Sequence, residues 1–151
     1  MSTIGFDTSN YTTSTAWTDG KTDINVRQIL YVKDGERGIR QSDGVFQHMK
    51  LMPVMYEKLS EQIDFKDVKA VGVSTRPRCV EGSYMPVFLA GEGYAKVVAN
   101  TVGVPLYEFS HQDGHIMAGI YSSGSFELLE NDFISVHLSG GTTEILKSRY
   151  N

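Results

Sequence analysis

The sequence has little of several features that define large classes of protein. It has one cysteine, Cys79, in 151 residues, which excludes an internal disulfide framework and favours a reducing compartment. No uninterrupted apolar run approaches the roughly 20 residues that a membrane helix needs. The first residues, MSTIGFDTSN, lack the basic start and apolar stretch of a signal peptide. We therefore expect a cytoplasmic protein without a membrane partner.

Positive charge is also scarce. Fourteen Lys and Arg residues stand against 18 Asp and Glu, which gives a net charge of −4 and a pI near 5.5. An extensive basic surface that binds nucleic acid is therefore not expected, although a local basic patch or a partner could supply the positive charge. The hydrophobic fraction of 40% is enough for the core of a globular chain.

The apolar pattern predicts an α/β fold with three strands first and alternating helices and strands after them. The expected elements are strands at 2–6, 12–17 and 25–32, a helix at 45–63, a strand at 68–74, a helix at 84–102, a strand at 106–109, a helix at 112–121 and a hairpin of 133–139 with 144–148. The last hairpin is similar to the first, which indicates a weak internal repeat of two lobes. We place the first lobe at 1–128 and the start of a second, truncated lobe at 129–151.

The first helix contains three residues whose roles can be predicted. Asp43 is well placed to be its N-cap. Pro53 should kink the helix, because proline lacks a backbone donor. His48 lies off the apolar stripe, so we expect it on the solvated face.

Two histidines follow the last strand of the first lobe, in the segment HQDGHIMA. His111 and His115 are four residues apart, a spacing that places both on one helical face. Two neutral imidazoles can bind Zn²⁺ or Fe²⁺ when other groups complete the shell. The pattern alone is weak, and two histidines that cap and pack a helix are an open alternative. A metalloprotease of the HExxH type is not favoured, because Gln112 stands where the general base should be.

Two turns offer groups that could meet a phosphate. The turn Ser139, Gly140, Gly141 and Thr142 can present backbone N–H groups and hydroxyls to an anion. The first hairpin turn carries Asp7 and Thr12, which we predict to be catalytic residues, because a carboxylate at this turn could meet a metal or a water near a phosphate. Each turn could equally be an ordinary hairpin connection.

The loop after the central strand holds Arg76, Arg78 and Cys79. The two arginines could meet an anion or RNA, or could be solvated, and an incidental cysteine is favoured over a reactive one. His137 should alternate away from its apolar neighbours in a strand, and we assign it no role.

Taken together, several segments resemble the N-terminal half of the tRNA threonylcarbamoyladenosine transferase family, also called glycoprotease or O-sialoglycoprotein endopeptidase. They occur in the order of the family and cover nearly the whole chain. The segments are IGFDTSNYTTSTA at 4–16, AVGVSTRP at 70–77, GEGYAKVVANTVGVPL at 91–106, HQDGHIMA at 111–118 and VHLSGGTTEI at 136–145.

The resemblance implies an actin-like ATPase fold, with a ribonuclease H-like lobe of a mixed five-stranded sheet and helices on both faces. It implies an acyltransferase that moves a threonylcarbamoyl group from its adenylate to N6 of the adenosine next to the tRNA anticodon. His111 and His115 would hold iron or zinc, with a more C-terminal aspartate. ATP or threonylcarbamoyl-adenylate would lie near Ser139, Gly140, Gly141 and Thr142.

The chain departs from the family pattern where the resemblance implies catalysis. Tyr11 and Thr12 stand in place of an acidic pair, and Thr142 replaces the usual histidine of the second turn. A divergent, non-catalytic paralogue that binds partner subunits, or forms a homodimer, is therefore an alternative to the transferase. A metallo-glycoprotease is the third and weakest reading. With only the start of a second lobe, we expect this chain alone to be inactive.

Overall fold

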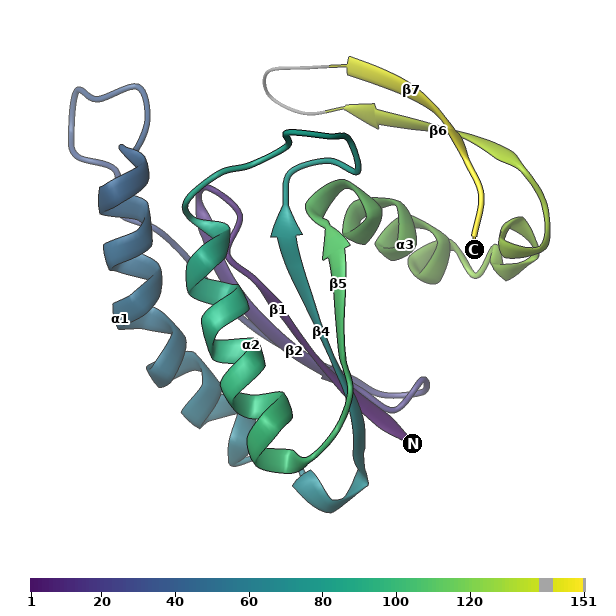
Figure 1. Cartoon of the computed structure of the whole chain (residues 1–151), viewed down its shortest axis with the longest axis horizontal. Coiled ribbons are helices and arrows are strands. Elements are labelled where there is room, and N and C mark those ends of the chain that lie inside the picture. The colour runs from purple at the N-terminus through teal and green to yellow at the C-terminus, as the bar shows by residue number, and fades with distance from the viewer. Residues whose placement is uncertain (139–142, 151) are drawn as a thin grey trace. The chain divides into compact units, whose positions relative to one another are not determined.

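The computed structural model describes residues 1–138 and 143–150, and it divides into two compact units. The first unit is Met1–His111 and the second is Gln112–Asn151. Figure 1 shows the elements of both units along the chain. Among the described residues, no helix is both long and apolar enough to cross a membrane.

The first unit is built on a mixed sheet of five strands in the order β3-β2-β1-β4-β5. β1, β4 and β5 run parallel to one another, whereas β2 is antiparallel to both β1 and β3. The strands are β1 (Ser2–Asp7), β2 (Thr12–Thr18), β3 (Asp23–Ile29), β4 (Val68–Arg76) and β5 (Leu106–Ser110). This arrangement confirms the predicted α/β class with a mixed five-stranded sheet.

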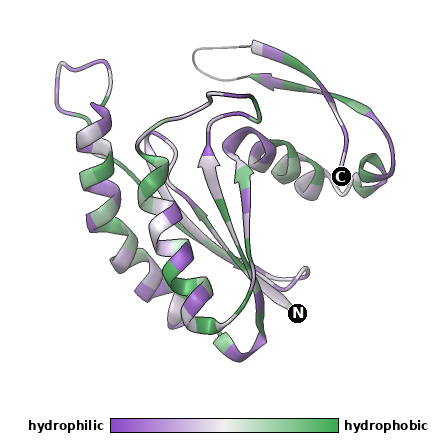
Figure 2. Ribbon diagram, in the orientation of Figure 1, coloured by the Kyte–Doolittle hydropathy of each residue, from purple (hydrophilic) through white to green (hydrophobic). Residues whose placement is uncertain are grey.

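Two helices, α1 (Gln41–Ser60) and α2 (Phe88–Val102), pack against the sheet and against each other. Because they contact each other, both cover the same face of the sheet (Figure 1). Hydrophobic and hydrophilic stretches alternate along both helices in Figure 2, as expected for helices with one buried face. The buried core between them and the sheet is Ile4, Phe6, Met52, Leu59, Val68, Val71, Val73, Ala95, Val98 and Ala99.

A buried threonine ties the end of β1 to the start of α2. Thr8 is fully buried, and its hydroxyl donates to the carbonyl of Val87 at 2.8 Å. The same oxygen accepts from the backbone N–H of Gly91 at 3.1 Å. A Cβ at Gly91 would lie 2.8 Å from Thr8 Oγ1, so only glycine permits this approach. The sequence predicts that Gly91 lies on the packed face of the helix, and the structure confirms it.

Gly91→Ala is therefore expected to lower the free energy of unfolding by about 1–3 kcal/mol, because the added methyl group overpacks a closed contact. Gly93→Ala is the matched control in the same helix. A Cβ at Gly93 meets nothing within 4 Å, so this change should raise the free energy of unfolding by roughly 0.5–1 kcal/mol. Urea unfolding of both variants checks the contrast. Equal effects of the same sign would show that Thr8 does not constrain the helix.

The second unit contains α3 and a hairpin. Its elements are α3 (His111–Ser123), which begins at the last residue of the first unit, the 3₁₀ turn η2 (Phe126–Glu130), β6 (Phe133–Leu138) and β7 (Thr143–Ser148). β6 and β7 pair antiparallel as a separate two-stranded sheet. The predicted lobe boundary at 128/129 stays a prediction, because no part of the structure tests it.

The start of α1 differs from the prediction. The helix begins at Gln41, four residues before the first apolar residue of the predicted stripe, and its N-cap is Arg40 without a side-chain cap. Asp43 lies in the first turn instead, where its negative charge interacts favourably with the positive end of the helix dipole. Pro53 lies inside the helix as predicted.

His48 does not lie on a solvated face. Its side chain is fully buried, and its Nδ1 atom lies 2.7 Å from the hydroxyl of Thr13 in β2. The apolar stripe misled the prediction because a polar residue of the sheet, Thr13, faces the helix at this point. A histidine can be buried when a hydroxyl satisfies one ring nitrogen.

Candidate functional site

The carboxyl ends of the three parallel strands bring polar side chains together. Asp7 is the last residue of β1, Ser74 is near the end of β4, and His111 follows β5 directly. In an open α/β sheet the carboxyl ends of parallel strands form the usual binding edge. All three residues belong to the first unit, so their geometry can be described within one body.

Asp7 is the centre of this cluster. Its Oδ2 atom lies 2.8 Å from His111 Nδ1, and its Oδ1 atom accepts from the backbone N–H of Ser9 at 2.8 Å. Ser74 also lies by the carboxylate and acts to lower its pKa. Burial has the largest single effect and acts to raise the pKa of Asp7. The hydrogen bond and charge of His111, together with the polar groups of Ser74 and Ser9, outweigh burial and lower the pKa to about 2. Asp7 is therefore an ionised carboxylate at neutral pH.

The His111 imidazole is held from two sides. Asp7 bonds its Nδ1 edge, and the buried ring of Phe88 at the start of α2 lies 6.2 Å away, centroid to centroid, at an interplanar angle of 54°. An imidazole whose Nδ1–H donates to a carboxylate carries its lone pair on Nε2. Nε2 is then the atom that can bind a metal or accept a proton.

Thr12, the other predicted catalytic residue, does not join this network. It begins β2, and its backbone N–H donates to the carbonyl of Ser9 at 3.0 Å in the first hairpin turn. Its predicted catalytic role is not tested by this position. The predicted phosphate-binding residues Ser139, Gly140, Gly141 and Thr142 lie outside the described residues, and their role also stays a prediction.

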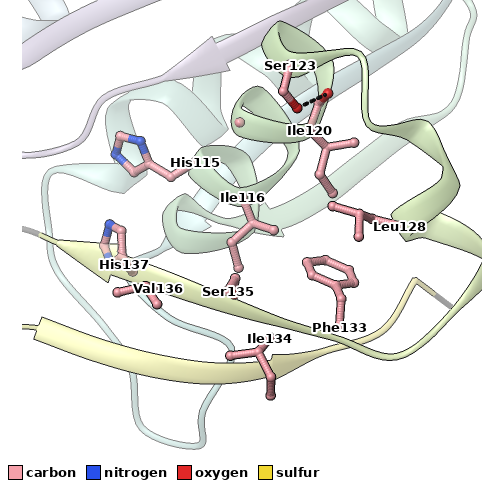
Figure 3. A pocket seen from close by; sticks show the side chains of 11 residues that line it. His115, Ile116, Ile120, Ser123, Leu128, Phe133, Ile134, Ser135, Val136 and His137 are labelled. Atoms are coloured by element: carbon pink, nitrogen blue, oxygen red, sulfur yellow. Dashed lines mark hydrogen bonds between the residues drawn. The ribbon is translucent and has the colours of Figure 1, made fainter.

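His115 lies in the second unit, beside a different histidine. Its ring centroid is 5.3 Å from that of His137 in β6. His137 Nδ1 is 3.8 Å from Glu144 Oε2, and Gln112 Nε2 donates to the same carboxylate oxygen at 2.6 Å. Figure 3 shows the two imidazoles at one end of a cavity of about 280 Å³, with Leu128 and other apolar side chains at the opposite end.

The metal that the family resemblance implies can be tested against these residues. His111, with its Nδ1 held by Asp7, matches the carboxylate–histidine arrangement that orients metal-bound imidazoles. However, the described part of the chain holds no group of three His, Cys, Asp or Glu side chains arranged around a metal position. His111 is thus an oriented candidate ligand for a metal. The described residues do not provide the other ligands of a complete shell.

Several residues of these sites were missed from the sequence. Ser74 could have been found, because it is the last residue of the strand predicted at 68–74. The neighbouring sequence does not indicate that Phe88, Gln112 or Glu144 belongs to a site, because each contacts a residue that is distant in the sequence. His137 was assigned no role, yet it neighbours His115.

The sequence profile of the family described as TsaD: tRNA N6-adenosine threonylcarbamoyltransferase matches residues 35–151, which is more than half of the chain. The chain belongs to this family. The histidine segment and the end of β4 lie within the match to TsaD.

Two curated TsaD relatives illustrate the similarity. A tRNA N6-adenosine threonylcarbamoyltransferase of Christiangramia forsetii is 32% identical over 98 residues, which are 64% of this chain and 27% of the relative. One of Pyrobaculum calidifontis is 28% identical over 144 residues, covering 94% of this chain and 40% of the relative. The matched regions thus span well under half the length of these TsaD relatives.

A solved structure confirms the fold. YeaZ from Pseudomonas aeruginosa superposes with a TM-score of 0.55 at 13% identity, covering 98% of this chain and 65% of that one. At this identity the likeness concerns the fold alone. The fold of this chain is therefore shared with a protein of low sequence similarity.

Proposed function

We propose that this chain is the metal- and adenylate-binding first lobe of a transferase that moves a threonylcarbamoyl group to N6 of the adenosine next to the anticodon in tRNA. The observation that carries the proposal is the cluster of Asp7, Ser74 and His111 at the carboxyl ends of the parallel strands, in a chain of the TsaD family. Its relatives' names state the tRNA substrate and the reaction.

In this proposal His111 binds a divalent metal, iron or zinc, through Nε2, and His115 is the second ligand proposed from the sequence. A bound metal would polarise the acyl carbonyl and stabilise negative charge on the adenylate. The protein would hold and orient the ligand, whereas Ser139, Gly140 and Gly141 are proposed to contact its phosphate. Further ligands and the tRNA surface would come from additional chain or from partner subunits.

A second candidate is a non-catalytic partner subunit of such a transferase. It is favoured by the first hairpin turn, where Tyr11 and Thr12 replace the acidic pair that the resemblance implies. Tyr11 is 43% exposed, so this position offers a contact surface where a catalytic carboxylate is expected. In this case the chain would keep the fold and bind a paralogue.

A tRNA modification assay distinguishes the two candidates. The mixture contains the chain, threonylcarbamoyl-adenylate, unmodified tRNA and zinc or iron, with and without candidate paralogous subunits, and mass spectrometry of digested tRNA measures the modified adenosine. The proposal predicts modification that requires this chain and falls at least about 100-fold with His111→Ala. Modification that is unchanged by His111→Ala, while this chain still binds a paralogue, would establish the partner subunit instead.

A further inference from the structure

We infer that Asp7 is a positioning residue, which orients His111 by fixing its proton on Nδ1 and thereby makes Nε2 the ligand atom. This inference rests on the proposed function, in which His111 binds a metal. It assigns Asp7 a role different from direct contact with the substrate or its phosphate.

The geometry fixes both partners of the pair. Asp7 Oδ2 lies 2.8 Å from His111 Nδ1, which is the length of a charge-assisted hydrogen bond. The other carboxylate oxygen is occupied by the backbone N–H of Ser9 at 2.8 Å. Because one oxygen is held by the turn, the carboxylate cannot rotate away without breaking a second hydrogen bond.

The imidazole is restricted as well. Phe88 is 2% exposed and its ring lies 6.2 Å from that of His111, so the imidazole packs against a fixed side chain of α2. Rotation of the ring about its long axis would therefore disturb both an aromatic contact and the Asp7 hydrogen bond. The two constraints come from different elements, β1 and α2, and together they define one ring orientation.

The chemical consequence concerns the tautomer. In water a neutral imidazole carries its proton on either nitrogen, and only the nitrogen without the proton can bind a metal. A carboxylate at Nδ1 selects the Nδ1–H form and increases the basicity of Nε2. Loss of such an outer partner commonly weakens metal binding by about 10- to 100-fold.

The test uses Asp7→Asn, which keeps the size of the side chain and removes its charge. Asp43→Asn is the matched control, because Asp43 is an exposed carboxylate in the first turn of α1. Long-range ¹H–¹⁵N NMR of histidine-labelled, metal-free protein reports the tautomer of His111. Calorimetric titration with Zn²⁺ then reports the affinity of each variant.

We expect His111 to be in the Nδ1–H form in the wild type and in Asp43→Asn, and to become a mixture in Asp7→Asn. The Zn²⁺ affinity of Asp7→Asn should fall by about 10- to 100-fold. An unchanged tautomer in Asp7→Asn overturns the inference, even if zinc still binds at His111. A tautomer that changes as expected in a protein without zinc affinity overturns the proposed metal site and leaves the orienting contact established. Far-ultraviolet circular dichroism confirms that each variant is folded.

Discussion

His111→Ala is expected to lower the affinity for Zn²⁺ by at least about 100-fold, more than the loss of an outer-shell partner would. The reason is that the substitution removes the ligand atom itself, together with the imidazole that Asp7 and Phe88 hold in place. Equilibrium titration with a chromophoric zinc chelator measures the change. The remaining affinity would come from His115 and from surface groups.

His137→Ala is the control for this prediction. His137 lies beside His115 in the second unit, but it has no place in the proposed metal shell. Its removal should change the zinc affinity by less than about threefold, since it alters only a neighbour of one ligand. A larger loss with His137→Ala than with His111→Ala would move the metal site from the strand ends to the hairpin of the second unit.

The second large effect is expected in acid, where His48 should destabilise the fold. Burial lowers the pKa of His48 to about 4, although the charge of Asp7 acts in the opposite direction. The unfolded chain therefore binds a proton more tightly than the folded protein, and stability is lost as the pH falls from about 6.5 toward 4. Between pH 7.5 and pH 5 this group alone should cost about 2 kcal/mol of the free energy of unfolding.

His48→Met tests that origin, because methionine fills a similar volume and does not titrate. In the described part of the chain, His48 Nε2 is buried without a hydrogen-bond partner. Replacing His48 by methionine therefore removes no hydrogen bond at this nitrogen. The hydroxyl of Thr13 does lose its contact with Nδ1, at a cost that is independent of pH. Urea unfolding at both pH values should show a smaller acid loss in His48→Met. An equal loss in both proteins would assign the acid sensitivity to other groups.

Much of the fold could be predicted from local patterns. The order of strands and helices follows from apolar periodicity, and glycine at 103 ends α2 in the left-handed conformation as its position suggests. Gly91 is a small residue on the buried face of α2, where it lies against Thr8 just after β1. The order of elements and the end of α2 depend on neighbours in the sequence, which is why they could be read directly.

The site could be predicted only in part, since its contacts join distant segments. The spacing of His111 and His115 predicted a shared site, but it gave no sign that Asp7, 104 residues away, bonds His111. The burial of His48 was missed for the same reason, because its partner Thr13 lies 35 residues away. Periodicity predicts which face of a helix is apolar. It does not predict which polar side chain of the sheet faces the helix.

The central claim is that His111 binds a divalent metal through Nε2 while Asp7 holds Nδ1. The most direct measurement is NMR of the protein loaded with ¹¹³Cd²⁺ and labelled with ¹⁵N in histidine, which detects scalar coupling between the metal and the bound nitrogen. We predict coupling to Nε2 of His111, with its Nδ1 still carrying a proton. Coupling to Nδ1 of His111, or metal coupled to His137 and not to His111, would contradict the account.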